Sequence, residues 1–597
     1  MSVAVVNHSR RTRWVRLGLV AVAGLALGLS WEPYGLWPLA LVAVPLLTLS
    51  LRGLRPRTAF GHGYLFALVA LTVSLSWVHV IAVPVAFALI TFMSLWFGLL
   101  GILLSHVGRL RLWPLWAACG WVATEFAFSR FPFGGFGWSR LGFTAVDGPL
   151  AGWFPVLGVA GVSFLVALTG HLGAWLVLRI LALRRARALT PSTAGEGRRA
   201  GRTASWRPVA LVATAVVAIG GTGAVLANTD PVIGAAERGT VDVGIVQGNV
   251  PGRGLDAMGR MRSVTNNHLS ETLHLMARAH LGQIAAPDFV LWPENSTDID
   301  PRTDPVTHAT VESAAEAAGV PILVGAVSYG PEEGQRQTTG MWWMPGVGPT
   351  TVYHKQDLVP FGEWIPMRDV LLPLVPMLAM VGAQGVPGTE PGALDVRLAD
   401  GRALVVGDVI CFELAYDDTI RSMVTNGAEV VVVQSNNATY GGTGQIEQQF
   451  AITRARAMET RREIAVATTN SVSGHIDRRG VVLQRSEEFT AASMMATMPV
   501  RQGLTPAMLI GPWVDLAITV AALLAWGVAL VLLRRERRRV GVGTDRPTAD
   551  PSSEPVSVPD PRATDPVLVG VRHDGPQSES GDTAATSPPP SQREPEH

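Results

Sequence analysis

The sequence predicts a polytopic α-helical membrane protein of about eight spans that carries an α/β domain, and three observations support this fold class. Of the 597 residues, 48% are hydrophobic and only 16% are charged, against about 25% charged in soluble domains. Eight stretches are apolar over a length close to the roughly 20 residues that a membrane helix needs. Between the seventh and the eighth, short β-branched runs alternate with amphipathic helical patterns, as in layered α/β domains.

The predicted spans begin behind a basic N-terminus, and the last one lies far from the other seven. The apolar part of the first span is short, so this segment could be a signal peptide. No small-residue cleavage pattern follows it and another apolar run begins at once, so we count it as a span. The eight predicted spans are 14–31, 36–51, 59–81, 84–107, 112–128, 155–178, 208–227 and 512–533.

Arginines in the loops predict the orientation of the spans, because basic residues concentrate on the cytoplasmic side. They gather at the N-terminus, after the second, fourth and sixth spans, in the stretch 198–202, and in the run 534–539. The short loops at 32–37 and 82–84 carry none. Eight spans with both termini in the cytoplasm satisfy every loop and place residues 228–511 outside the cytoplasm.

The chain therefore divides into four parts. We expect a membrane domain with seven helices at 1–227, an extracytoplasmic domain at 228–511, the eighth helix at 512–533, and a cytoplasmic tail at 534–597. The tail is basic at first and then contains, from 541 onward, 11 prolines and no Phe, Trp or Tyr. Such a segment cannot bury enough apolar surface to offset chain entropy, so we expect it to be disordered.

Composition also argues against several functional classes. The net charge is only +1 and the basic residues flank apolar segments, which argues against a nucleic-acid partner. Two cysteines are too few for a disulfide scaffold or a cysteine-rich metal site. His268, His274 and His280 lack the spacing of a zinc-binding helix, and the loop 441–444 lacks the lysine of a phosphate loop. We therefore expect no metal and no cofactor.

Cys411 is the first candidate for chemistry. It follows the apolar run 403–410, which predicts a buried strand, and precedes Asp417, which could cap a helix that starts near Ile420. A cysteine at a strand-to-helix turn presents its sulfur at a cleft, as a nucleophile requires. A free cysteine is also often a small buried hydrophobe, and position alone does not separate the two interpretations. Cys119 lies inside a predicted span, and we expect it to be structural.

Two more residues with catalytic potential stand at the ends of predicted strands. Glu294 ends the run 289–293, where desolvation would raise its pKa, although a helix-start acid or a solvated acid fits equally well. Lys355 follows the strand predicted at 351–354 and is the single lysine among 48 Lys and Arg residues, so a plain surface role is disfavoured. Together with Cys411 they predict acyl transfer through a thioester: the glutamate takes the thiol proton, the cysteine attacks a carbonyl, and the ammonium stabilises the oxyanion.

The motifs around these residues resemble the Glu-Lys-Cys signature of the nitrilase superfamily and, more narrowly, its bacterial membrane branch, the apolipoprotein N-acyltransferases. The resemblance implies an α-β-β-α sandwich on the outer face of the plasma membrane. It also implies that Glu294 is the general base, Lys355 the oxyanion stabiliser and Cys411 the nucleophile, with Glu363 and Glu413 as supporting acids that orient the lysine and the cysteine turn. The matching segments are 247–249 (QGN), 291–295 (LWPEN), 353–355 (YHK), 358–363 (LVPFGE), 410–413 (ICFE) and 435–437 (SNN).

The same resemblance implies the substrates. An acyl chain would pass from a membrane phospholipid to the cysteine and then to the α-amino group of the diacylglyceryl cysteine of an apolipoprotein. A membrane-tethered amidase acting on a small amide would use the same three residues and is the alternative. One span would suffice for an amidase, whereas eight suit a substrate that lies in the bilayer. The aromatic loop 131–138 fits lipid contact, and we expect the loop of Tyr440 to border the lipid entrance.

Overall fold

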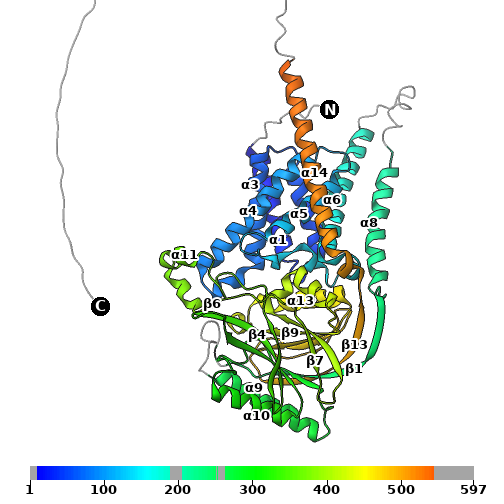
Figure 1. Cartoon of the computed structure of the whole chain (residues 1–597). Helices are drawn as coiled ribbons and strands as arrows, with labels where there is room; N and C mark the ends of the chain where they lie inside the picture. The colour runs from blue at the N-terminus through cyan, green and yellow to red at the C-terminus, as the bar shows by residue number, and fades with distance from the viewer. Residues whose placement is uncertain (1–9, 189–204, 251, 253–261, 543–597) are drawn as a thin grey trace, which may run out of the picture. The chain divides into compact units, whose positions relative to one another are not determined.

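The computed structural model describes residues 10–188, 205–250, 252 and 262–542, and helices fill the segments in which spans are predicted. The basic stretch 198–202 and the tail predicted to be disordered lie largely or wholly outside these residues. Figure 1 shows the helices gathered at one end of the described chain. They are α1 (Arg10–Gly28), α2 (Ala40–Leu51), α3 (Pro56–Ser74), α4 (Val83–Val107), α5 (Trp113–Phe128), α6 (Phe154–Ala188), α8 (Arg207–Leu226) and α14 (Pro506–Val542).

Length and composition make four of the described helices candidates to cross a membrane. They are α4, the helix of α6 together with its preceding turn, α8 and α14. The segment Trp37–Leu51, which contains α2, is apolar but shorter. Each predicted span thus coincides with a helix, while the total of eight spans stays a prediction. Proline stands in the first turn of α3, α4, α5 and α8, where its missing N–H removes no helical hydrogen bond.

The segment between α8 and α14 forms two β-sheets. The first has the strand order β13-β1-β2-β3-β4-β5, with β6 paired to β4, and the second has the order β12-β11-β10-β9-β8-β7. The strands of the first sheet are β1 (Ile233–Gln247), β2 (Phe289–Leu291), β3 (Ile322–Tyr329), β4 (Gln335–Met344), β5 (Gly348–His354), β6 (Gln384–Gly385) and β13 (Ala492–Leu504). Those of the second are β7 (Ala393–Arg397), β8 (Ala403–Ile410), β9 (Val430–Ser435), β10 (Ile464–Thr468), β11 (Gly474–Ile476) and β12 (Val482–Arg485).

The two sheets face each other across a largely apolar buried layer. Ile245 and Leu291 of the first sheet and Val406 and Val432 of the second belong to this one buried cluster. Helices α9 (Ser263–His280) and α10 (Pro305–Ala318) cover the outer face of the first sheet. Helices α12 (Asp417–Thr425) and α13 (Gly444–Thr460) cover the second. The layers therefore follow the α-β-β-α order that the resemblance implied, and Figure 1 shows α13 between the sheets and the membrane helices.

Several details differ from the sequence predictions. β8 has the bounds of the predicted strand 403–410, but β4 was not predicted, because its sequence QRQTTGMWWM lacks a clear alternation of apolar and polar residues. The helix predicted after the cysteine turn is present, but it starts at Asp417 instead of near Ile420, and no side chain among the described residues caps it, so the cap predicted at 417–419 was wrong. Asp417 is the first residue of α12, and its carboxylate pairs instead with Arg140 at 2.6 Å and Arg456 at 2.8 Å.

Candidate active site

The three candidate residues follow strands of both sheets. Glu294 comes three residues after the end of β2, Lys355 comes directly after β5, and Cys411 comes directly after β8. β2 and β5 belong to the first sheet and β8 to the second, so the site lies where the ends of the two sheets meet. Glu294 is 4% exposed and Lys355 is 1% exposed. A buried carboxylate and a buried ammonium require partners, because unpaired charges are costly away from water.

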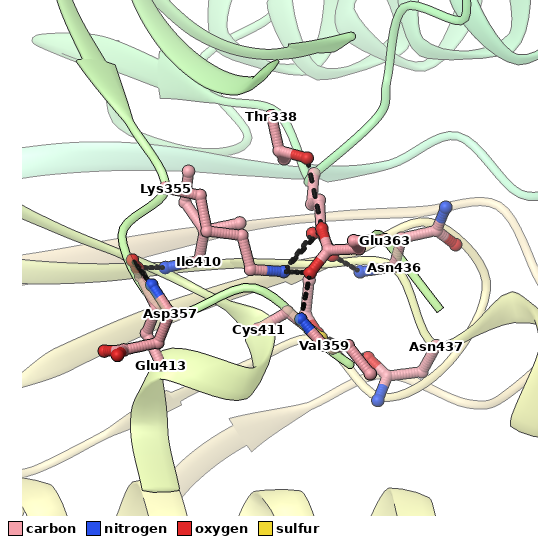
Figure 2. Close-up of polar contacts among 12 residues, drawn as sticks. Thr338, Lys355, Asp357, Val359, Glu363, Ile410, Cys411, Glu413, Asn436 and Asn437 are labelled. Atoms are coloured by element: carbon pink, nitrogen blue, oxygen red, sulfur yellow. Dashed lines mark hydrogen bonds and ion pairs between the residues drawn. The ribbon is translucent and has the colours of Figure 1, made fainter. Parts of the chain in front are cut away.

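Lys355 supplies the partner for two carboxylates. Its Nζ donates to Glu294 Oε1 at 2.9 Å and to Glu363 Oε1 at 3.0 Å, and Figure 2 shows the ammonium directed at Glu363. Backbone N–H groups hold the carboxylates from the other side. Asn436 N donates to Glu294 Oε2 at 2.8 Å, and Val359 N donates to Glu363 Oε2 at 2.7 Å. The lysine is therefore fixed by two acids that are themselves fixed by the backbone.

Burial raises the pKa of both the candidate base and the thiol in this cluster. Burial raises the pKa of Glu294 above its ordinary value, while the ammonium of Lys355 acts in the opposite direction. Burial alone would lower the pKa of Lys355, but the charges of Glu294 and Glu363 outweigh it and raise that pKa. Burial also raises the pKa of the Cys411 thiol to about 12. A carboxylate with a raised pKa is a stronger base, which reduces the free-energy cost of removing such a proton.

The backbone at Cys411 is strained in a way that presents its side chain. Its φ is +54°, a left-handed conformation that residues other than glycine rarely adopt. Such strain persists only where the surroundings fix it, and it is common at active sites. Sγ lies 4.0 Å from Oε1 of Gln449, which α13 carries. The left-handed backbone and the amide oxygen near the sulfur argue against the interpretation of Cys411 as a plain buried hydrophobe.

Glu413 connects the lysine loop to the cysteine turn. Its side chain is fully buried. Oε2 accepts from Ile410 N at 2.7 Å, and Oε1 accepts from Gln356 N at 2.6 Å and from the hydroxyl of Tyr353 at 2.7 Å. Burial raises its pKa to about 7, although these donors favour the ionised form. One carboxylate thus holds the residues that flank Lys355 and Cys411.

The sequence prediction did not include the amide network beside the cysteine. Gln449 Nε2 donates to Ser435 Oγ at 2.6 Å, and Asn437 Nδ2 donates to Gln449 Oε1 at 2.6 Å. Gln445 Nε2 donates to the same oxygen at 2.9 Å. The motif 435–437 gave a signal for two of these residues, but the glutamines belong to a helix without a recognisable motif. Asn437 and Gln445 hold Oε1 of Gln449, the oxygen that lies near the sulfur of Cys411.

Aromatic side chains join the cysteine turn to the membrane domain. The ring of Phe412, the residue after the nucleophile candidate, lies 5.8 Å from that of Phe136 and 6.0 Å from that of Trp138. Both belong to the aromatic loop that the sequence analysis assigned to lipid contact. Tyr440 packs edge-on against Trp77 at 5.1 Å, in the segment between α3 and α4. The residues next to the sulfur are thus continuous with loops of the membrane domain.

The other candidates do not join this site. Cys119 is buried in α5, as expected of a structural residue. His268 is buried against Trp292, and burial lowers its pKa to about 4, so its ring is neutral at ordinary pH. Within the described residues, no group of three or more His, Cys, Asp or Glu side chains is arranged to hold a metal ion.

Comparisons with known proteins match both the membrane part and the two-sheet part of the chain. A family model described as the apolipoprotein N-acyltransferase N-terminal domain matches residues 23–172, and one described as carbon-nitrogen hydrolase matches residues 243–527. The apolipoprotein N-acyltransferase of Mycolicibacterium smegmatis is 35% identical over 522 residues, which cover 85% of this chain and 83% of that protein. The chain belongs to the apolipoprotein N-acyltransferase family.

Other relatives extend the match. The apolipoprotein N-acyltransferase of Azotobacter vinelandii is 28% identical over 549 residues, which cover 89% of this chain and 98% of that protein. Among solved structures, an amidase from Nesterenkonia sp. aligns at 18% identity with a TM-score of 0.31, over 45% of this chain and 93% of its own. The family resemblance predicted from the motifs is confirmed by the two bacterial relatives and the two family models.

Proposed function

We propose that this protein is a membrane N-acyltransferase that works through a thioester on Cys411. It takes a fatty acyl chain from a membrane phospholipid and transfers it to the α-amino group of the diacylglyceryl cysteine of an apolipoprotein. Family membership supports the reaction class. The observation that carries the assignment of residues is the buried cluster in which Lys355 joins Glu294 and Glu363 beside the presented cysteine.

In the first half-reaction, Glu294 takes the proton of the Cys411 thiol and the sulfur attacks the ester carbonyl of the phospholipid. A tetrahedral oxyanion forms, and the ammonium of Lys355 stabilises it. The C–O bond then breaks, the leaving alkoxide takes the proton back from Glu294, and a lysophospholipid departs. The acyl chain remains on the sulfur as a thioester.

In the second half-reaction, the amine of the apolipoprotein attacks the thioester carbonyl. Glu294 takes the proton that the amine loses, Lys355 again stabilises the oxyanion, and the C–S bond breaks. The thiolate recovers its proton from Glu294, and the amide product departs. Glu363 and Glu413 do not react: the first holds the ammonium and the second holds the two loops that carry the lysine and the cysteine.

Lipid substrates are supported by what surrounds the cysteine. Phe412 packs on the loop 131–138, whose Phe131 is 64% exposed. Phe133 of the same loop lies 6.1 Å from the ring of Phe361 in the lysine loop. Exposed aromatic residues at the edge of a membrane domain are typical of the interfacial belt. An acyl chain can therefore approach the sulfur along an apolar surface.

The localisation proposed is the bacterial plasma membrane, with residues 228–511 on its outer face and both termini in the cytoplasm. The apolar helices support membrane insertion, and the arginine clusters support the orientation. A reporter fused after Asn228 should act outside the cytoplasm, and one fused after Val540 should act inside. Both reporters on the same side would contradict the span count.

The alternative, a membrane-bound amidase for small amides, shares the first chemical step but not the substrate. Mass spectrometry of the purified protein after incubation with phospholipid separates the two. We expect a fatty acyl adduct on the peptide that contains Cys411, released by hydroxylamine and transferred to a diacylglyceryl peptide with a free amine. Turnover of small amides without such an adduct would favour the amidase.

A further inference from the structure

Asp408 is a buried acid that the mechanism above does not use. It lies on β8 three residues before Cys411, its side chain faces the layer between the two sheets, and it is fully buried. Its backbone N–H donates to Gly392 O at 2.8 Å. Among the residues that the structure describes, neither carboxyl oxygen has a hydrogen-bond partner. Buried polar atoms are seldom left in this state, so the carboxyl group calls for an explanation.

A second unpaired oxygen lies beside it. Oε1 of Gln434, on the neighbouring strand β9, also has no partner within the described chain. A Cβ built on Gly340 of the opposite sheet would lie 2.0 Å from Asp408 Oδ2 and 3.0 Å from Gln434 Oε1. Both oxygens therefore approach the same glycine, which leaves them room. Two acceptors beside one glycine can satisfy each other only if one of them carries a hydrogen.

The charge around Asp408 opposes ionisation. Burial raises its pKa well above the ordinary value, and the charges of Glu413 and Glu294 act in the same direction. The hydroxyl of Tyr353, the other titratable group near it, is already committed to Glu413 at 2.7 Å. An isolated carboxylate in an apolar layer takes up a proton rather than bear the desolvation cost.

We propose that Asp408 is a neutral carboxylic acid that donates its hydrogen to Oε1 of Gln434 and thereby acts as a positioning residue for Glu294. This inference rests on the proposed role of Glu294 as the general base. Gln434 is the link between the two. Its Nε2 donates across the sandwich to Trp292 O at 2.6 Å, two residues before Glu294, and to Leu323 O at 3.3 Å.

Gln434 also precedes the residue that makes the second contact with Glu294. Two residues after it, Asn436 donates its N–H to Glu294 Oε2 at 2.8 Å. The amide therefore holds the strand that leads to the base, and the backbone that carries the amide continues into the turn that binds the base. If the amide lost its bond to Asp408, it could rotate, and both supports of Glu294 would loosen.

The protonation state can be measured without reference to activity. Protein labelled with ¹³C at the aspartate carboxyl carbons is compared with its Asp408→Asn variant by infrared spectroscopy at pH 8. We expect the difference spectrum to contain the carbonyl band of a neutral acid that shifts in D₂O. Loss of a carboxylate band instead would show that Asp408 is ionised and would overturn the inference.

The positioning role is tested by matched substitutions. Asp408→Asn keeps a donor of the same shape and should form the acyl-enzyme within about twofold of the normal rate, whereas Asp408→Val removes the donor and should be slower by about tenfold. The loss should appear in the maximal rate at saturating phospholipid and leave KM unchanged. A normal rate for the valine variant, or an asparagine variant as slow as the valine one, would overturn the role.

Gln434→Met provides a second route if the valine variant does not insert in the membrane. It removes the amide and should show the same loss of maximal rate, and Asp408→Asn should add nothing to it. Glu294→Gln separates this inference from the proposed function. If Glu294→Gln forms the acyl-enzyme normally, the proposed function fails. If it is inactive while Gln434→Met is normal, only the positioning role fails.

Discussion

Lys355→Arg is the substitution that tests the proposed mechanism most directly. Every other permanently cationic side chain in this protein is an arginine, so an arginine at position 355 preserves the charge and matches the residue type used for positive charge elsewhere in the chain. If charge were sufficient, the variant would work. If a compact ammonium is required to reach two carboxylates and an oxyanion from one point, arginine would fail, because its donors form a rigid planar fork.

The geometry sets the size of the effect. Nζ carries three hydrogens, of which two are committed to Glu294 at 2.9 Å and Glu363 at 3.0 Å, so one remains for the oxyanion. The side chain is 1% exposed, and the bulkier guanidinium has no room without displacing the acids. Loss of one oxyanion donor typically costs about 3–4 kcal/mol, or roughly a hundredfold to a thousandfold in rate. We therefore expect acyl-enzyme formation by Lys355→Arg to fall by that factor.

The assay is the rate of acyl-adduct formation on Cys411, followed by mass spectrometry in detergent or vesicles. Two control variants show what rates to expect for loss of the charge and for a harmless exchange of Arg and Lys. Lys355→Met removes the charge at similar length and should be at least as inactive. Arg402→Lys exchanges the same two residue types at a half-exposed position paired with Asp288 and Asp400, and should be normal. An arginine variant that keeps about half of the normal rate would refute the oxyanion role of the lysine.

Three further predictions concern the nucleophile, the base and the connection to the membrane domain. Cys411→Ser should insert normally and form no acyl-enzyme, because a hydroxyl is a far weaker nucleophile than a thiolate, while Cys119→Ser should have almost no effect. The rate of N-acylation of a lipopeptide measures both variants. Near-normal N-acylation by Cys411→Ser would contradict the assignment of Cys411 as the nucleophile. Glu363→Gln should move the acid limb of the pH–rate profile to lower pH, because the charge of Glu363 is one of the groups that raise the pKa of Glu294. An unchanged limb would contradict this. Gln448→Leu leaves two buried indole N–H groups and two carbonyls without partners, at about 1–3 kcal/mol for each group, and should lower the thermal unfolding midpoint measurably.

The strand ends that carry the site could be predicted because their sequence signals are local. The run 403–410 is apolar and ends sharply at Cys411, and β8 has those bounds. β5 likewise ends one residue before Lys355, where polar residues begin. Glu294 was harder to place, since β2 is only three residues long, but the proline at 293 marks the end of the extended run.

The contacts between strands could not be predicted in this way. Asp408 and Gln434 stand inside apolar runs and look like defects in otherwise ordinary strands. The side chains of Asp408 and Gln434 come together only because of the strand register, which pairs Asp408 with Val432 and Ile410 with Gln434. They also require the space beside Gly340 of the other sheet. Register between distant strands is a tertiary property, so a single sequence gives no access to it.

The buried ion pairs illustrate the same limit. Arg140 lies in the loop between α5 and α6, yet its guanidinium pairs with Asp417 at the start of α12. Arg456 of α13 pairs with both Asp417 and Glu459. The arginine-based orientation argument treats such residues only as charge outside the bilayer, whereas these three elements are held together by paired groups that are individually costly to bury.

Helix α13 explains how the catalytic domain is held on the membrane domain. Two adjacent glutamines on this helix contact different parts of the protein, one the membrane domain and the other the candidate active site. Gln448 accepts from the indoles of Trp77 and Trp138 at 3.0 Å and 2.9 Å and donates to two carbonyls near α1 and α3 at 2.7 Å, so all its polar capacity serves the membrane domain. Gln449 serves the network beside Cys411. Because consecutive residues of one helix cannot move independently, a movement of the membrane loops that carries Gln448 with it would also displace the oxygen that faces the sulfur.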